Sequence, residues 1–342
     1  MSSIPQAHKL ETIRAIWAML ERPPGIDKAC FSMHNARMSH AQQVHTTHDI
    51  CFVQAYAKIN LTLDVLGRRT DGYHELVTVM QTIDLHDTLC LSATNDQQVQ
   101  LICSQPALSN AENLAARAAL IVRQHIGSTQ GIKIELYKRI PMAAGLGGGS
   151  SDAAAVLLAL QHWWQLDLPP EDLLNIAASL GSDVPFFLTG GLALCEGRGE
   201  RVTPLNAYWP QHMRWLLLLK PAISVSTAAV FRQLPASDYT NGTHSRAVCD
   251  ALQAHKEPQI GDLHNGLERS VLQSYPEVVQ AREDMLRAGA PYVRLSGSGP
   301  TLFTPFAELA PALHVQRQLQ TLGYEVYLSR AFTPAREQIN LF

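Results

Sequence analysis

The chain has 342 residues, of which 46% are apolar and 17% charged, a composition that predicts packed cores and, at this length, two domains. Its 27 basic and 30 acidic residues give a net charge of −3, which excludes the strongly basic balance of a dedicated nucleic-acid binder. No apolar run approaches the roughly 18 residues that a membrane-spanning helix needs, so we expect neither nucleic acid nor membrane as a partner.

Residues 1–49 differ from the rest, because they hold five of the fourteen histidines and show little strand patterning. Apolar residues at helical spacing run over residues 9–21 and stop at Pro23. The segment lacks the apolar region of a signal peptide, and its acidic residues argue against a transit peptide. We expect a poorly ordered extension. The alternatives are a histidine-rich metal tract, or a true start codon farther along, at Met33 or Met38.

The six cysteines lie far apart, without a C-x-x-C pair. This spacing is typical neither of a zinc site nor of a disulfide framework. It favours buried, reduced thiols in a cytoplasmic protein.

Strand and helix patterns intermix from Cys51 onward. Strands are predicted over residues 57–67, 76–91 and 131–140 from their apolar alternation. Helices are predicted over residues 113–126, 150–164 and 171–180, the last ending at Gly181. Because no regular β-α-β rhythm emerges, an α+β class is favoured over a parallel doubly wound sheet.

A second domain is expected from residue 210, which divides the chain into residues 1–49, 50–209 and 210–342. The four consecutive leucines that begin at Leu216 predict a buried strand. Two or three helices are expected between Ser226 and Gly289, with further strands near Val293 and Tyr324.

A glycine-rich loop, Pro-Met-Ala-Ala-Gly-Leu-Gly-Gly-Gly-Ser-Ser-Asp, covers residues 141–152 between a predicted strand and a predicted helix. Its glycines let the backbone approach a ligand closely. Amides in such a loop, followed by a helix N-terminus, attract an anion. Ser150 and Ser151 add hydroxyls suited to phosphate or Mg²⁺. The loop therefore predicts a phosphate site, the alternative being a flexible capped turn.

The loop is not one of the commonest phosphate-binding motifs. It has no Gly-Lys-Ser or Gly-Lys-Thr of a Walker A sequence, and Ser150 stands where G-x-G-x-x-G requires its third glycine. Neither H-R-D nor D-F-G of the protein kinases occurs. A different class of nucleotide-binding loop is required.

The loop resembles the P-x-x-x-G-L-G-S/G-S-S motif of the GHMP kinases, and residues 295–301 (Leu-Ser-Gly-Ser-Gly-Pro-Thr) resemble the third motif of that superfamily. Two segments are similar to one of its families, the 4-diphosphocytidyl-2-C-methyl-D-erythritol kinases. They are residues 57–61 (Ala-Lys-Ile-Asn-Leu) with 69–76 (Arg-Thr-Asp-Gly-Tyr-His-Glu-Leu), and residues 180–187 (Leu-Gly-Ser-Asp-Val-Pro-Phe-Phe). The matches occur in family order and span residues 55–303.

The resemblance implies a two-domain GHMP kinase fold, with an ATP-binding N-terminal domain like ribosomal protein S5 domain 2 and a ferredoxin-like C-terminal domain. It implies phosphorylation by ATP, with Mg²⁺, of the 2-hydroxyl of 4-diphosphocytidyl-2-C-methyl-D-erythritol. The products would be the 2-phosphate and ADP, in the non-mevalonate route to isopentenyl diphosphate.

The resemblance also implies roles for individual residues. Asp183 would be the catalytic base, and Lys58 would pair with it and orient the hydroxyl. ATP would contact Pro141, Met142, Ala143, Ala144, Gly145, Leu146, Gly147, Gly148, Gly149, Ser150, Ser151, Asn113 and Lys138. The acceptor would contact Asn60, Tyr73, His74, Thr227 and Phe231. Mg²⁺ would arrive with ATP, with Ser151 as its candidate contact.

Without the resemblance, these residues have ordinary interpretations. Lys58 would face outward from a strand, Asp183 would be a solvated turn residue, and Lys138 would be a solvated strand end. One point follows from geometry alone: Lys58 and Asn60 are two residues apart on a predicted strand and therefore share a face.

Three other functions remain open from the sequence: another GHMP small-molecule kinase such as homoserine kinase, a non-catalytic regulator with the same fold, and a nucleic-acid-binding module. The Arg-x-Asp-Gly-Tyr-His segment disfavours the first, and the presence of Lys58 and Asp183 disfavours the second. The acidic balance, with only seven lysines, disfavours the third. We expect a cytoplasmic monomer or weak homodimer.

Overall fold

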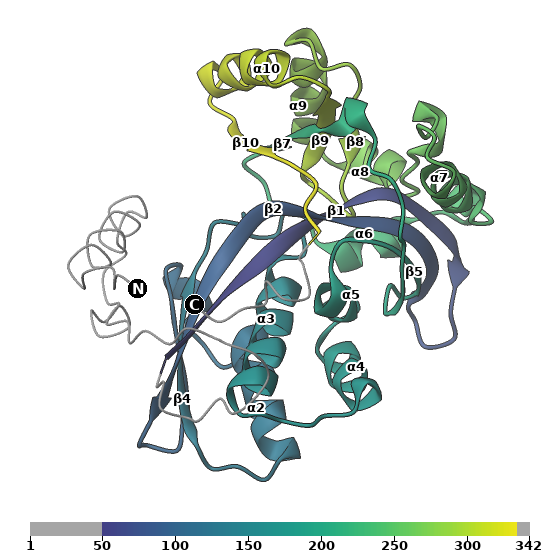
Figure 1. Ribbon diagram of the computed structural model, residues 1–342. Helices are drawn as coiled ribbons and strands as arrows, with labels where there is room; N and C mark the ends of the chain where they lie inside the picture. Colours follow the sequence, from purple (N-terminus) through teal and green to yellow (C-terminus); the bar gives the residue numbers. More distant parts are fainter. Residues whose placement is uncertain (1–49, 334–342) are drawn as a thin grey trace, which may run out of the picture.

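The computed structural model describes residues 50–333 (Figure 1). The expected helix over residues 9–21 and the expected extension lie outside the described residues. Across the described range, every helix is too short or too polar to span a bilayer.

Two long strands run through the middle of the molecule. β1 (Ile50–Arg68) pairs antiparallel with β2 (His74–Thr94). Their register shifts between Tyr56 and Lys58 and again between Asn60 and Thr62. Such irregularities bend a strand and change the direction of nearby side chains. Lys58 and Asn60 therefore lie on a short stretch of β1 with an irregularity at each end.

The strand β2 is the centre of a six-stranded sheet of order β3-β4-β2-β5-β6, with β1 also on β2. The other strands are β3 (Val99–Cys103), β4 (Gly131–Tyr137), β5 (Leu192–Gly197) and β6 (Arg201–Pro204). The helices α2 (Leu114–His125), α3 (Gly148–Trp163), α4 (Pro170–Leu180) and α5 (Val184–Thr189) lie together below β1 and β2 (Figure 1). Their alanine- and leucine-rich faces pack with Ile132, Ile134 and Leu136 of β4 in one core.

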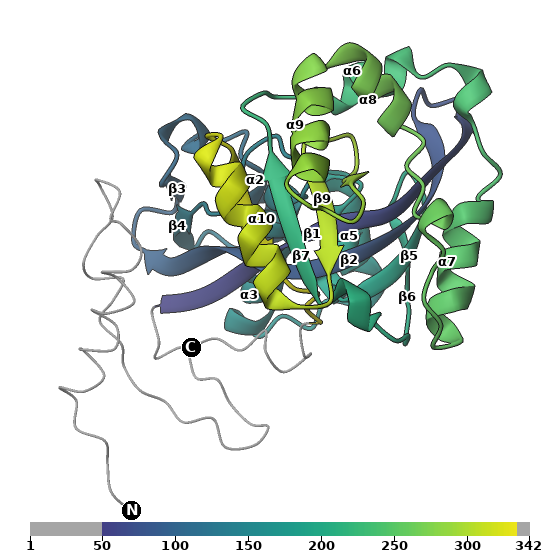
Figure 2. The same ribbon diagram turned by 90° about the horizontal axis from the view of Figure 1, so that it is seen from above.

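A second sheet has four strands, β7 (Trp215–Lys220), β8 (Arg294–Leu295), β9 (Leu302–Phe306) and β10 (Glu325–Ser329). Its order is β10-β7-β9-β8, and all neighbours are antiparallel. This is the strand order of a ferredoxin-like βαββαβ fold, so that prediction is confirmed. The helices α9 (Pro276–Arg287) and α10 (Leu309–Thr321) cover the outer face of this sheet, away from β1 and β2 (Figure 2).

Four α-helices lie between Ser226 and Gly289, so the prediction of two or three is wrong. Besides α9 they are α6 (Thr227–Gln233), α7 (Thr243–Gln253) and α8 (Glu268–Ser274). Short 3-10 helices occur at Pro106–Leu108, Gln211–Met213, Ala236–Asp238 and Ile260–Asp262. Two of the four α-helices have only seven residues. That is about two turns, too few for a clear helical pattern in the sequence.

The two sheets share their cores. Leu63 and Val65 of β1 pack in one apolar cluster with Leu217 and Leu219 of β7. A second shared cluster joins other side chains of β1 to β7 and β9. The predicted division at residue 210 falls between β6 and β7 and stays a prediction, but β1 contributes to the cores on both sides of it.

The predicted free thiols are confirmed at four positions. Cys51, Cys103, Cys195 and Cys249 are buried and free. Burial raises the pKa of Cys51 to about 12, so this thiol is protonated and unreactive.

Candidate active site

A cavity of about 1160 Å³ lies between the glycine-rich loop, the middle of β1 and the start of α6. It exceeds the roughly 300–1,000 Å³ of a pocket for one small ligand, so it has room for two substrates. With one exception, the predicted site residues line it: Lys58, Asn60, Tyr73, His74, Asn113, Lys138, every residue from Pro141 to Ser150, Asp183, Thr227 and Phe231. The exception is Ser151.

The glycine-rich loop is held in a conformation that only glycine adopts easily. Gly145 and Gly147 have φ values of 74° and 71°. A Cβ on Gly145 would lie 2.5 Å from the carbonyl oxygen of Ser296, and one on Gly147 would lie 2.7 Å from the ring of Phe187. The loop is therefore packed tightly, and α3 begins directly after Gly147. The first amides of α3 can receive an anion beside the cavity.

The two serines of the loop have different environments. Ser151 is 3% exposed, and its hydroxyl donates to the carbonyl oxygen of Tyr56 at 2.6 Å. Ser150 lines the cavity. The prediction that Ser151 contacts phosphate or Mg²⁺ gains no support from this placement, and Ser150 is the hydroxyl that a ligand would meet.

Lys58, Asn60 and Asp183 form a connected group at the base of the cavity. The Lys58 Nζ lies 2.6 Å from Asn60 Oδ1 and 3.5 Å from Asp183 Oδ2. The Asn60 amide also donates to Thr78 Oγ1 at 2.8 Å, which fixes its orientation. The outward-facing alternative for Lys58 is wrong, since the residue is 4% exposed.

Asp183 combines contact with the lysine and access to the cavity. It directly precedes α5, and its side chain is 30% exposed. Across from it, a Cβ on Gly297 would lie 3.4 Å from Lys58 Nζ and 3.1 Å from Asn60 Oδ1. The third glycine motif therefore packs directly against the lysine and the asparagine.

Lys138 is buried in an ion cluster. Its Nζ lies 2.5 Å from Asp87 Oδ2 and 2.7 Å from Asp152 Oδ2, so the solvated-end alternative is wrong. Burial opposes the charge on Lys138, but the two carboxylates raise its pKa. Burial raises the pKa of Asp152 to about 8, despite the attraction of Lys138. Asp87 also accepts from the backbone amide of Ile140 at 2.8 Å, so the cluster anchors the chain just before the loop.

Asn113 serves as the N-cap of α2. Its side-chain oxygen accepts from the amide of Ala115 at 2.9 Å, and its side-chain amide donates to the carbonyl oxygen of Leu108 at 3.0 Å. The residue lines the cavity with its side chain already hydrogen-bonded.

The opposite end of the cavity is aromatic. The ring of His74 lies 5.1 Å from that of Phe231, tilted by 30°, and 6.0 Å from that of Tyr239. Tyr73 is 53% exposed, with the Arg198 guanidinium 4.9 Å from its ring centre. Burial, helped by the charge of Arg68, lowers the pKa of His74, so its ring is neutral near pH 7. Neutral aromatic faces of this kind suit a nucleobase.

The sequence did not predict three arginines of the cavity wall, Arg68, Arg198 and Arg232. None belongs to the segments that carry the resemblance, and single arginines carry no spacing signal. It also did not predict Asp152, although this residue directly follows the two serines of the loop.

Comparison with known proteins gives two family matches. Residues 113–191 match the GHMP kinases N terminal domain, and residues 250–325 match the GHMP kinases C terminal domain.

Curated relatives cover most of the chain. The 4-diphosphocytidyl-2-C-methyl-D-erythritol kinase of Alkaliphilus metalliredigens is 40% identical over 286 residues, which cover 82% of this chain and 96% of the relative. The protein of the same name from Pelotomaculum thermopropionicum is 42% identical over 282 residues, covering 82% and 97%.

Two solved structures are also similar to this chain. A crystal structure of 4-(cytidine 5'-diphospho)-2C-methyl-D-erythritol kinase has a TM-score of 0.67 and 35% identity, covering 82% of this chain and all of that one. The homoserine kinase of Cytophaga hutchinsonii has a TM-score of 0.66, covering 85% of this chain and 98% of that one. At 20% identity, this second likeness shows the shared fold alone.

Proposed function

Because the chain belongs to the 4-diphosphocytidyl-2-C-methyl-D-erythritol kinase family within the GHMP kinases, we propose that Asp183 and Lys58 carry out its phosphoryl transfer. The enzyme uses ATP to phosphorylate 4-diphosphocytidyl-2-C-methyl-D-erythritol, in the non-mevalonate route to isoprenoids. The predicted family, α+β fold and activity are confirmed. The observation that supports the proposed roles is the 3.5 Å contact between Lys58 and Asp183 beside the N-terminus of α3.

We propose that the triphosphate of ATP occupies the glycine-rich loop, with its phosphates at the first amides of α3. The loop backbone and the helix dipole both favour an anion there. Lys58 reaches this position, because a Cβ on Gly147 would lie only 3.2 Å from Lys58 Cγ. The transferred phosphoryl group would therefore lie between the loop and Lys58.

In the chemical step, Asp183 accepts the proton of the 2-hydroxyl while the hydroxyl oxygen bonds to the γ-phosphorus and the bond to ADP breaks. An ammonium group has three N–H donors. Asn60 and Asp183 engage two of those on Lys58, which leaves one for an oxygen of the transferred phosphoryl group. Neutralising that charge and positioning the hydroxyl are the main demands of phosphoryl transfer.

We propose that Mg²⁺ enters with ATP and that Ser150 is the residue that would contact it. Ser150 lines the cavity, and a hydroxyl oxygen is a ligand that Mg²⁺ accepts. When bound, the ion would neutralise phosphate charge. Ser151 is less suitable, since its hydroxyl already donates to Tyr56.

The acceptor would occupy the aromatic end of the cavity. A cytosine ring can stack there against Tyr73, beside the contacting rings of His74 and Phe231. Arg68, Arg198 and Arg232 line the same end and suit the diphosphate of the substrate. Thr227 shares a 2.7 Å hydrogen bond with Ser298, which joins this wall to the third glycine motif.

The test measures formation of the phosphorylated product in Asp183→Asn, in Lys58→Met and in the double variant. Each single change should lower kcat on the order of 10²–10⁴-fold with little change in acceptor affinity, as expected for loss of a positioned base. The kcat of the double variant should be scarcely lower than that of either single variant, because the two residues act in one step.

The matched control is Asp167→Asn, an exposed aspartate outside the cavity. It should retain wild-type kcat, and all variants should bind ATP normally if folded. Losses that multiply in the double variant would contradict the paired mechanism. Near-normal activity in Asp183→Asn would reject Asp183 as the base. Phosphorylation of homoserine at a rate comparable with that of 4-diphosphocytidyl-2-C-methyl-D-erythritol would contradict the acceptor assignment.

We also propose that the enzyme works in the cytoplasm as a monomer or weak homodimer, without nucleic-acid or membrane partners. The acidic balance of the chain supports the absence of a nucleic-acid partner. Light scattering over a range of concentrations tests the oligomeric state.

A further inference from the structure

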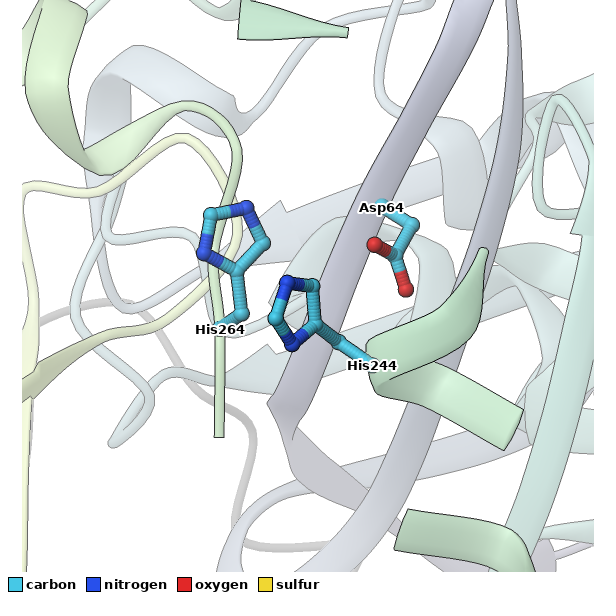
Figure 3. Close-up of side chains that lie close together, drawn as sticks. All are labelled: Asp64, His244 and His264. Atoms are coloured by element: carbon cyan, nitrogen blue, oxygen red, sulfur yellow. The ribbon is translucent and has the colours of Figure 1, made fainter. Parts of the chain in front are cut away.

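Away from the catalytic cavity, Asp64, His244 and His264 lie close together (Figure 3). Asp64 comes from β1, His244 from α7 and His264 from the segment before α8. One ligand atom from each lies within 4.8 Å of the others. None of the three lines the catalytic cavity, so phosphoryl transfer does not explain their grouping.

Asp64 is fully buried, yet it has no lysine or arginine partner among residues 50–333. Its Oδ2 accepts from the amide and hydroxyl of Ser245 at 2.8 and 2.6 Å. Among the described residues, its Oδ1 accepts only from the hydroxyl of Thr240, at 2.7 Å, which leaves a lone pair for a further ligand. A buried carboxylate held only by neutral donors is costly unless a cation lies nearby.

The histidines also have unmet bonding capacity. Within the described part of the chain, His244 Nδ1 and His264 Nε2 are buried without a hydrogen-bond partner. The closest carboxylate contact of His244 Nδ1 is Asp262 Oδ1, at 3.7 Å, which is too long for a hydrogen bond. Buried nitrogens without partners are uncommon, and an ion is one of the standard reasons for them.

We propose that Asp64, His244 and His264 bind a divalent transition-metal ion, with zinc as the best match. Two imidazole nitrogens and one carboxylate oxygen form a donor set that zinc prefers and magnesium does not. The imidazole rings of His244 and His264 lie against each other, with centroids 4.5 Å apart. Zinc bonds of about 2.0–2.2 Å place tetrahedral ligand atoms roughly 3.4 Å apart, so both rings would have to rotate to bind the ion. The hydrogen bonds from Ser245 hold the carboxylate as outer-shell partners do.

The site would stabilise one wall of the active site. The carbonyl oxygen of His264 accepts from the amide of Leu63 on β1 at 2.8 Å. The side chain of Asn265, the next residue, donates to the carbonyl oxygens of Leu295 and Gly297 at 2.9 and 2.8 Å. An ion at His264 would therefore fasten β1 and α7 to the segment that supports the third glycine motif.

The experiment uses the untagged full chain, stripped with a chelator and titrated with zinc by calorimetry without nucleotide. One equivalent should bind per chain, and Tm should rise with zinc concentration. His264→Gln and His244→Gln should each weaken binding by at least the roughly 10–100-fold that loss of an outer-shell partner causes. Cobalt should give the visible absorption of a four-coordinate ion in the wild type and lose it in both variants.

Two controls separate this site from other histidines. His125→Gln changes an exposed histidine on α2, and His45→Gln with His48→Gln changes the histidine-rich N-terminal segment. Both controls should bind zinc like the wild type. Absence of binding, equal affinity in folded His264→Gln and His244→Gln, or loss of the equivalent in the N-terminal variant would each overturn the proposal. None of these measurements depends on kinase activity.

Discussion

Replacing Gly147 with alanine tests whether the glycine-rich loop needs its observed backbone conformation. The residue has a φ of 71° and directly precedes α3. An added Cβ would meet the ring of Phe187 at 2.7 and 2.8 Å and Lys58 Cγ at 3.2 Å. The contacts below 3.0 Å require Phe187 to move, and Phe187 belongs to α5, which begins just after Asp183.

The magnitude follows from two effects. A non-glycine residue in the left-handed region costs about 1–2 kcal/mol. Forcing an extra carbon against a packed ring typically costs about 1–3 kcal/mol more. Gly147→Ala should therefore lower the free energy of unfolding by roughly 2–5 kcal/mol. Gly149→Ala is the matched control. Its Cβ would meet only Leu114 Cδ1 at 3.7 Å, so it should gain the roughly 0.5–1 kcal/mol of alanine over glycine in a helix.

Urea unfolding of the two variants and the wild type measures the difference in their free energies of unfolding. The KM for ATP shows whether the loop still binds the nucleotide. Gly147→Ala should be the less stable variant and should use ATP less well. Equal stability of the two variants would refute the reasoning, because it would mean that the loop relaxes without strain. Gly147→Val should lower both stability and the use of ATP more than Gly147→Ala does, since a β-branched residue is still less compatible with positive φ.

Four further variants test other parts of the site. Ser150→Ala should raise the KM for ATP, whereas Ser151→Ala should chiefly lower stability, by about 0.5–1.5 kcal/mol, because it removes the hydrogen bond that the Ser151 hydroxyl donates to the carbonyl oxygen of Tyr56. Tyr73→Ala should weaken acceptor binding by about 1–3 kcal/mol with the KM for ATP unchanged, and equal effects on both substrates would contradict stacking. Burial raises the pKa of Asp152 from 3.8 to about 8, so its stabilising contribution should be lost as the pH rises from about 4 to 8. Circular dichroism across that range should show a flatter stability profile for Asp152→Asn.

The glycine-rich loop and the long helices could be predicted because their signals are local. Glycine spacing, an alanine-rich helix after the loop and the stop at Gly181 lie within short windows of sequence. The strand expected near Val293 is present as β8, whereas the helices α6 and α8 were not predicted individually, because helices this short show no full period. Tertiary contacts, rather than local pattern, determine them.

The candidate site was predictable only as far as motifs extend. The common face of Lys58 and Asn60 follows from the two-residue period of a strand, and the 2.6 Å contact between them confirms it. The arginines Arg68, Arg198 and Arg232 reach the same cavity from three separate segments, which no spacing rule connects. The burial of Ser151 was not predictable either, since adjacent residues of a helix point about 100° apart and only packing decides which one meets the cavity.

Lys58 and Lys138 both lie in or next to strands of one sheet, and local sequence does not distinguish them. Lys138 Nζ contacts two carboxylates, those of Asp87 and Asp152, and both are buried. Lys58 has one carboxylate partner, Asp183, which is partly open to the cavity, and one neutral partner, Asn60. A base must reach both its cation and the substrate proton, and only the second arrangement allows this. The partial exposure of the carboxylate beside Lys58 therefore supports the proposed catalytic role of Lys58.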